Sequence, residues 1–155
     1  MSKLNKPQPQ SSKQDQQSIE LENKIMTFDP RTLGKSVYEA LTTLRGNQTK
    51  DDPIVKKQRS MAQELYTYLS TWGLMRLKAE EKALGTDGRE QSVKAFFRCL
   101  ENISGKQNLA NDQGLETLKN LTVDEYLGLT GLGLAIAQEF SFWTTAVYHD
   151  VSGED

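Results

Sequence analysis

The chain has 155 residues and a formal net charge of −2 at pH 7, and this length suits one domain. A charge so near zero provides no general electrostatic attraction to nucleic acid or to an anionic membrane. The single cysteine, Cys99, excludes an internal disulfide framework and a cysteine-based zinc site. It also favours a reducing compartment, so we expect a cytoplasmic protein.

The first 24 residues are rich in Gln, Lys, Ser and Pro and contain few large apolar side chains. Because such a segment buries too little surface to offset its ordering entropy, residues 1–24 are predicted to be a disordered polar tail. This tail lacks the apolar region of a secretory signal. No stretch has the ~20 apolar residues that span a bilayer, so we expect no membrane contact.

Residues 25–150 are predicted to form one helical domain, followed by a frayed C-terminus at 151–155. The first helix opens at Asp29, a suitable cap, followed by Pro30, which suits the first helical position. Apolar side chains then recur at helical spacing until Gly46 ends the element.

The second helical region begins at Asp52-Pro53, which repeats the same start signal, and runs to about Leu84. Gly73 interrupts this region, because glycine weakens a helix interior. One kinked helix and two collinear helices both fit the pattern. The apolar residues expected on one face are Ile54, Met61, Leu65, Tyr68, Leu69, Trp72, Ala79 and Ala83.

A third helix is predicted after a GTDG turn, with Asp87 or Thr86 as its cap. Its apolar residues run from Val93 to Ile103, and Ser104-Gly105 ends it.

The sequence LETLKNL is expected to supply one short helix, and Thr122 with Glu125 fits a capping box that opens the last helix. No useful length of chain alternates apolar and polar residues as a strand does. The predicted fold class is all-α, a single-domain bundle of about five helices with long central and C-terminal helices.

Residues 125–143, EYLGLTGLGLAIAQEFSFW, contain three glycines and few charges. A phosphate-binding loop needs a preceding strand or a Gly-Lys-Ser/Thr ending, and both are missing. The apolar part is about half a membrane span. A helix with a heptad-like seam fits better, and it is expected to be buried on most sides with Gly133 near a neighbouring helix. The seam residues are Tyr126, Leu129, Gly133, Ile136, Phe140, Trp143 and Val147.

Few side chains suggest catalysis. His149 is the only histidine and lies near the C-terminus, while Cys99 is expected to be a small buried apolar residue. Acidic pairs are interpreted as caps or solvated charges, so we predict no active site, no metal site and no cofactor. These pairs are Asp51-Asp52, Glu80-Glu81 and Asp124-Glu125.

Charge is unevenly distributed along the chain. Residues 53–106 contain ten basic and six acidic side chains, whereas residues 109–155 contain one basic and eight acidic ones. The basic side chains of the second and third helices are therefore suited to phosphate backbone contact without sequence preference. From charge alone, a solvated face of mixed sign is the simpler interpretation.

The helices KSVYEALTTL, YLSTWGLMRLKAEEKAL, VKAFFRCLENISG and TVDEYLGLTGLGLAIAQEFSFWTTAVY together resemble a known family. It is the small all-helical subunit of type III CRISPR–Cas effector complexes, closest to the Cmr-type branch. The family has a Gly-Leu element like Gly73-Leu74 and a Tyr-Leu-x-Leu-Thr-like phrase before its last helix. The resemblance covers roughly residues 34–148, and it departs from the family at Trp143, which lacks the basic neighbours often found there.

The resemblance implies a non-catalytic protein, whose copies stack along the inner filament of the complex. Its implied partners are the large subunit, the backbone subunits, copies of itself, and the guide RNA and target RNA, whose duplex it supports through backbone contacts. Charge placement, rather than a shared family motif, selects the residues expected to contact phosphate. They are Lys56, Lys57, Arg59, Lys78, Lys82, Arg89, Lys94 and Arg98.

The alternative hypothesis is a helical adaptor that binds only protein and no nucleic acid. Its interface would be exposed apolar or aromatic surface, such as Tyr66, Phe142 and Tyr148.

Overall fold

The computed structural model describes residues 13, 29, 31–85 and 87–152. The predicted polar tail therefore lies outside the described residues, apart from Lys13, as do the last three residues of the chain. The chain from Arg31 onward forms one compact unit.

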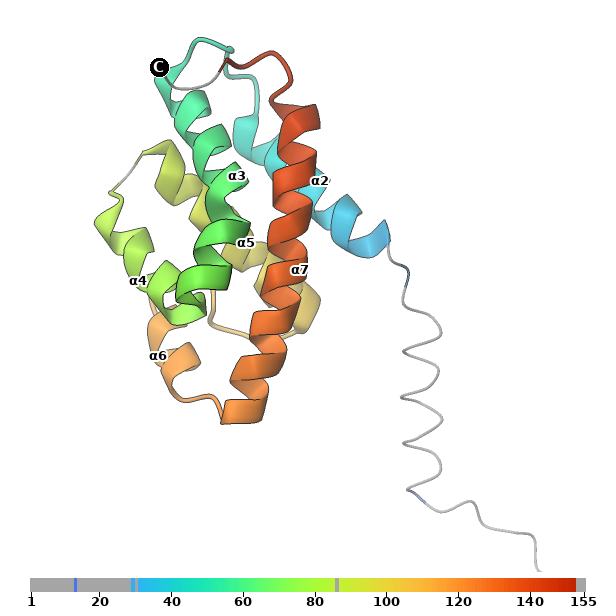
Figure 1. Ribbon diagram of the computed structural model, residues 1–155, viewed down its shortest axis with the longest axis vertical. Helices are drawn as coiled ribbons and strands as arrows, with labels where there is room; N and C mark the ends of the chain where they lie inside the picture. Colours follow the sequence, from blue (N-terminus) through green and yellow to red (C-terminus); the bar gives the residue numbers. More distant parts are fainter. Residues whose placement is uncertain (1–12, 14–28, 30, 86, 153–155) are drawn as a thin grey trace, which may run out of the picture. The chain divides into compact units, whose positions relative to one another are not determined.

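Helices make up this unit, and its described residues include no strand. The all-α prediction is therefore confirmed, with six helices in the described part of the unit because the second helical region is divided in two. The helices are α2 (Arg31–Arg45), α3 (Pro53–Trp72), α4 (Leu74–Ala83), α5 (Gly88–Ser104), α6 (Gly114–Lys119) and α7 (Val123–Val147) (Figure 1).

The break between α3 and α4 lies at Gly73. Its φ of 85° and ψ of 173° leave the helical region, and its N–H donates to the carbonyl of Leu69 at 2.9 Å. A residue with a Cβ rarely adopts such a φ. The chain turns at this point, and α4 leaves the direction of α3 (Figure 1). The region is therefore two helices, and they are not collinear.

The predicted apolar face of the region is partly wrong. Ile54 and Trp72 are exposed, and so are Ala79 and Ala83 on α4. The prediction continues one helical spacing across Gly73. Because α4 runs in another direction than α3, it buries Leu74, Leu77, Lys78 and Glu81 instead.

The predicted helix starts are confirmed at three places. Asp52 accepts the Ile54 N–H at 2.9 Å, and Asp87 accepts the Arg89 N–H at the same distance. The Thr122 side chain forms the expected capping box that opens α7. Such caps satisfy backbone donors that a helix leaves unpaired.

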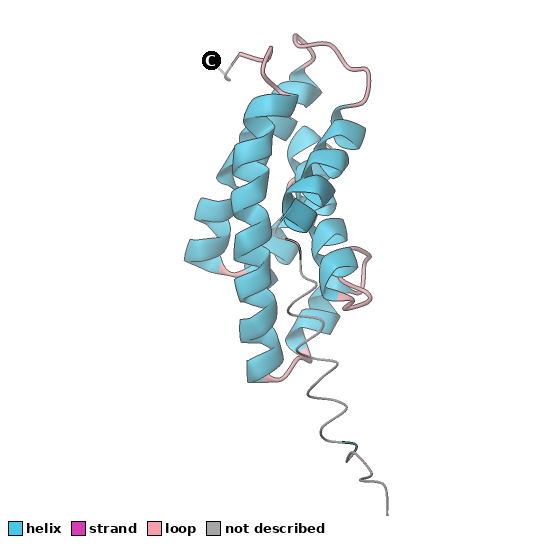
Figure 2. Cartoon of the chain, turned by 90° about the vertical axis from the view of Figure 1, so that its right-hand side faces the viewer, coloured by secondary structure: helices cyan, strands magenta, loops and turns pink. Residues whose placement is uncertain are grey.

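Helices α3 and α7 lie side by side and run in opposite directions (Figure 1). The view from the side in Figure 2 shows only helices and loops among the described residues. The Tyr126 hydroxyl accepts the Met75 N–H at 3.2 Å at one end, and Ser141 Oγ donates to the Gln63 carbonyl at 3.3 Å further along. Helices α2 and α5 pack against this pair, so four helices enclose the core.

The centre of the core is aromatic. The ring centroid of Phe96 lies 5.2 Å from that of Phe97 and 6.0 Å from that of Phe140, in edge-to-face geometry. All three side chains are fully buried. This arrangement links α5 to α7 through the preferred geometry of aromatic pairs.

Gly133 is where α7 approaches its neighbours most closely. A Cβ added at this position would lie 3.3 Å from Leu74 Cδ2, 3.4 Å from Leu69 Cδ2 and 3.5 Å from Phe96 Cζ. These side chains occupy the space that any larger residue would need. The prediction that this glycine lets a neighbouring helix approach is confirmed.

The opposite side of α7 is uncovered, which contradicts the expectation of a helix buried on most sides. Val123, Leu127 and Phe142 are 75%, 61% and 62% exposed. The reason is geometric, since α2, α3 and α5 all pack against one side of α7.

The C-terminal end of α7 is fastened by polar contacts. Arg45 donates to the Val147 carbonyl at 2.7 Å and forms two hydrogen bonds with the Asp150 carboxylate. The hydrogen bond from Arg45 lowers the pKa of Asp150 to about 2. Val151 is buried, so packing extends into the segment expected to be frayed, 151–155.

Replacing Gly133 with leucine should destabilise the fold, because the new side chain overfills a packed core at a cost of roughly 1–3 kcal/mol. Thermal and denaturant unfolding of the purified chain measure this cost. Gly131→Leu is the matched control, since an added Cβ there meets nothing within 4 Å. It should leave stability unchanged or raise it by up to ~1 kcal/mol, because glycine disfavours helix. Equal melting temperatures for the two variants would contradict the close approach at Gly133.

Candidate functional site

Side chains with catalytic chemistry do not converge. Burial raises the pKa of the Cys99 thiol to about 11, so it stays protonated near neutral pH. His149 is exposed, and its Nδ1 lies 3.1 Å from the Ala146 carbonyl oxygen. Among the described residues, no group of three or more His, Cys, Asp or Glu side chains is placed to hold a metal ion.

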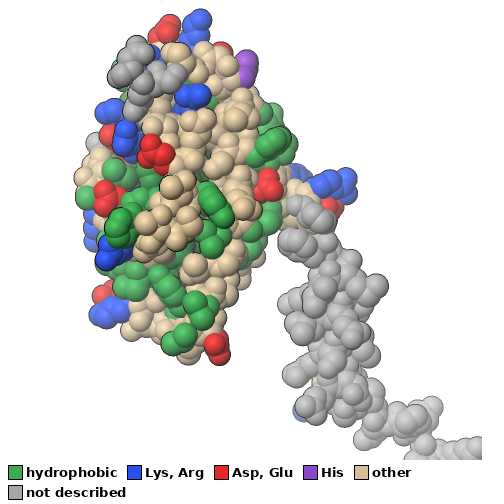
Figure 3. Space-filling view, in the orientation of Figure 1, with side chains coloured by type: hydrophobic (Ala, Val, Ile, Leu, Met, Phe, Trp, Pro, Cys, Tyr) green, Lys and Arg blue, Asp and Glu red, His purple; other side chains and the backbone are tan. Residues whose placement is uncertain are grey.

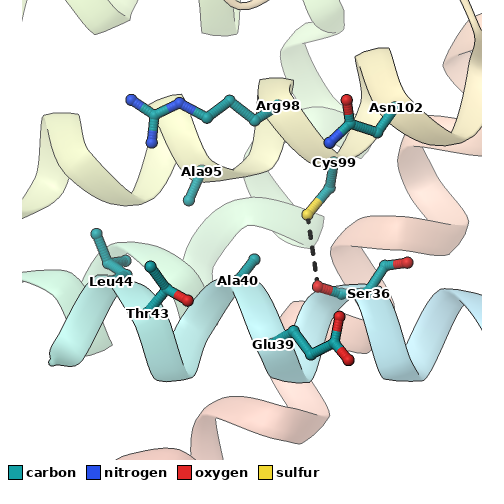
Figure 4. Close-up of a pocket in the computed structure, with 9 residues that line it drawn as sticks. All are labelled: Ser36, Glu39, Ala40, Thr43, Leu44, Ala95, Arg98, Cys99 and Asn102. Carbon is teal, nitrogen blue, oxygen red and sulfur yellow. Dashed lines mark hydrogen bonds between the residues drawn. The ribbon is translucent and has the colours of Figure 1, made fainter.

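A groove of about 540 Å³ lies between α2 and α5. Cys99 points across it toward α2, with its Sγ 4.0 Å from the Ser36 carbonyl oxygen, whereas Arg98 extends along α5 and away from α2 (Figure 4). The residues that line the groove include one carboxylate, Glu39, and no histidine. They are Ser36, Glu39, Ala40, Thr43, Leu44, Ala95, Arg98, Cys99 and Asn102.

The acidic pairs serve mainly as structural groups. Asp52 and Glu125 take part in helix caps, as expected. Glu81 differs from the expectation of a solvated charge, because it is buried and lies 2.8 Å from the Lys78 ammonium. A buried pair of opposite charges compensates the cost of removing each from water.

Lys78 is therefore enclosed instead of presented at the surface. Its ammonium also lies 4.8 Å from the centroid of the Phe97 ring, and its side chain passes so close to Gly114 that an added Cβ would clash with it. In this fold, Lys78 joins α4 to α5 and α6. It offers no charge to an external phosphate.

Two other predicted phosphate-binding residues are held in ion pairs. Lys94 lies 2.7 Å from Glu90 on the same helix, and Lys57 lies 3.4 Å from Asp87. The hydrogen bond to Glu90 raises the pKa of Lys94. Both side chains keep partial exposure, but much of their charge is already compensated within the chain.

The other predicted basic residues are spread over several surfaces. Lys56 and Arg59 lie on α3, Lys82 is exposed on α4, and Arg98 is exposed on α5. Arg89 is half-buried near the start of α5. Basic and acidic side chains are interspersed on the face seen in Figure 3. Three of the eight predicted residues, Lys78, Lys82 and Lys94, line one hollow together with Glu81, Glu90 and Asp112.

One of the three residues predicted to form an exposed protein interface is not at the surface. Tyr148 is buried, and its hydroxyl donates to Gln58 Oε1 at 2.8 Å, because the Arg45 contacts fold the end of the chain onto the bundle. Burial raises the pKa of Tyr148. Tyr66 and Phe142 are exposed, as that hypothesis requires.

The apolar row on α7 is one surface that the sequence analysis missed. Val123 and Leu127 are exposed near the start of α7 and Phe142 about 22 Å further along, at 1.5 Å per residue, and the same helix buries its other side. The sequence places apolar residues on two sides of this helix. It does not show which of the two sides packs against the other helices.

A stacked pair of side chains is the second missed surface. Arg76 lies over the ring of exposed Trp72, with Cζ 4.8 Å from the ring centroid. Helical spacing predicts a buried Trp72, because its position around the helix matches that of the core residues.

No helix in the described part of the chain is long and apolar enough to cross a membrane. Comparisons with protein-family models, curated proteins and solved structures find no match. Any functional assignment therefore rests on the surfaces described above and on the sequence resemblance.

Proposed function

We propose that this chain is a non-catalytic helical subunit of a larger assembly, which it joins through the uncovered side of α7. The observation that carries the proposal is the exposure of Val123, Leu127 and Phe142 along one helix. These side chains lie at the two ends of one helix face, and a partner that covered the whole face would bury all three.

The backbone of α7 is accessible on the same side. A Cβ added at Gly128 or Gly131 would meet nothing within 4 Å. Residues 126–138 include no charged side chain. A partner helix would therefore approach closely without removing charges from water, which favours packing as in a helix bundle.

The assembly we propose is a cytoplasmic type III CRISPR–Cas effector complex, with this chain as its small subunit. The sequence resemblance and the all-helical fold support this assignment. Copies of the chain would stack beside the large and backbone subunits and support the duplex of guide RNA and target RNA. Lys56, Arg59, Lys82 and Arg98 are the predicted residues best placed for phosphate contact, since none of them forms a salt bridge with another described residue.

A protein-only adaptor is the second candidate, and one observation favours it. Lys57, Lys78 and Lys94 each pair with an acidic side chain of the same chain, which reduces their value for RNA. Both candidates use the surface on α7, and they differ in whether RNA binds at all.

Placing glutamate at both Leu127 and Phe142 should remove the chain from its assembly, because the new charges would have to be buried against the partner. The measurement is recovery of large and backbone subunits with an affinity-tagged chain from native cells. Both positions are exposed, so the variant should melt within a few degrees of the natural chain.

Gln48→Glu with Gln107→Glu is the matched control, because it adds two charges at exposed loop positions. It should assemble normally. If the α7 variant kept all its partners, the proposed interface would be wrong.

RNA binding separates the two candidates. The small-subunit proposal expects weak binding that decreases with salt, and replacing both Lys56 and Arg59 with glutamate should make the salt dependence shallower. Each phosphate contact to a single strand contributes about 0.7 to the slope of log affinity against log salt, so the expected change is roughly 1.4.

Lys35→Glu with Lys50→Glu reverses two exposed charges outside the predicted set and should alter that slope less. A chain that assembles with protein yet shows no RNA contact, alone or assembled, would be the adaptor.

A further inference from the structure

We infer that the outer face of α3 binds single-stranded RNA, with one unpaired base stacked on the Trp72–Arg76 pair. This inference rests on the proposed function in one respect, which is that the partner is RNA. It differs from backbone contact with a duplex, because the contact is made to the face of a base.

Trp72 is the last residue of α3, and its side chain is 52% exposed. The Arg76 guanidinium lies 4.8 Å from its ring centroid. Aromatic rings and guanidinium planes are the surfaces on which proteins stack unpaired bases. The pair therefore presents both kinds of stacking group at one corner of the fold.

The platform is held in place by its surroundings. Trp72 ends α3, and Gly73 turns the chain directly after it. The Tyr126 hydroxyl accepts the N–H of Met75 at 3.2 Å and fixes the first turn of α4, from which Arg76 projects. A prearranged surface loses less entropy on binding.

A polar hollow of about 370 Å³ continues from Trp72 along α3. Its hydroxyl and amide groups suit the edges of bases and the ribose 2′-hydroxyl. A protein-binding hot spot would instead be expected to lie among apolar neighbours. The residues that line it are Ser60, Gln63, Glu64, Thr67, Tyr68, Thr71 and Trp72.

Basic side chains lie at the other end of the same helix. Lys56 precedes Ser60 by about one turn, and Arg59 is beside it in sequence. From Lys56 to Trp72 the helix rises roughly 24 Å, at 1.5 Å per residue, which is a span of several nucleotides. At about 100° per residue, Lys56 lies roughly 160° around the helix from Trp72, so a strand that reached both would have to cross α3.

Negative charge determines which part of the strand faces the platform. Glu64 lines the hollow, and Glu80 lies close enough to Tyr68 to add to the rise in its pKa, which burial mainly causes. Carboxylates repel phosphate, so the backbone should face solvent while bases point toward α3. In a duplex the base faces are already stacked on neighbours, so an unpaired strand is required.

Tryptophan fluorescence tests the stacking directly. The only other tryptophan is Trp143, so Trp143→Phe leaves Trp72 as the sole tryptophan. The variant is titrated with an eight-residue oligouridylate and, separately, with an eight-residue abasic ribose-phosphate chain. We expect saturable quenching by the first and little by the second, because only the first carries bases.

Trp143 packs against Tyr38, with ring centroids 5.3 Å apart, so its replacement lowers stability if the site cannot adjust. If that variant does not fold, the difference in quenching between the natural chain and Trp72→Phe provides the same readout.

Affinity for the oligouridylate supplies the second readout. Trp72→Ala should weaken binding roughly tenfold or more, in the range measured for loss of one base–aromatic stack. Trp72→Phe should stay within about threefold, and Glu64→Gln should strengthen binding. Phe142→Ala is the matched control, an exposed aromatic residue on α7, and should leave RNA affinity unchanged.

The outcomes separate this inference from the proposed function. If RNA binds through Lys56 and Arg59 while Trp72 emission and Trp72→Ala affinity stay unchanged, the stacking platform is wrong and the RNA-bound role stands. If the Trp72→Ala chain loses a protein partner and keeps RNA, the surface is a protein interface and the inference fails. If no RNA binds under any condition, both the inference and the RNA part of the proposed function fail.

Discussion

The close approach of helices at Gly133 is the constraint on which the rest of the structure depends. Leucine side chains from the end of α3 and the start of α4, together with Phe96 of α5, occupy the space that a side chain at this position would fill. One residue of α7 is therefore in contact with three other helices. Because packed interiors tolerate neither voids nor overfilling, this contact fixes the depth at which α7 sits and the position at which α3 gives way to α4.

That arrangement also explains where function can lie. Helix α7 uses one side for the core, and none of the other described helices packs against its apolar outer side. The turn at Gly73 brings Leu74 against Gly133, and Trp72, the residue just before the turn, is exposed. The candidate surface at the end of α3 is thus next in sequence to this packed contact. Neither surface needs a catalytic group, which agrees with a proposed role in assembly and RNA contact.

Local signals predicted most of the fold. The caps at Asp52, Asp87 and Thr122 follow from hydrogen bonds within a few residues, so the sequence alone indicates where α3, α5 and α7 begin. The surface assignments were less successful for physical reasons. Helical phase could not show that the axis changes at Gly73, and charge could not show that Lys78 is buried with Glu81. Likewise, the hydrogen bond between Tyr148 and Gln58 joins residues 90 positions apart, a contact that no local pattern encodes.

The central claim is that the outer side of α7 is an interface that remains uncovered in the isolated chain. Oxidative footprinting by hydroxyl radicals measures the exposure of individual side chains, both in the purified chain and in its native assembly. We predict that hydroxyl radicals oxidise Leu127 and Phe142 readily in the isolated chain, and that both side chains lose most of this reactivity in the assembly. Equal reactivity of both side chains in the two states would contradict it.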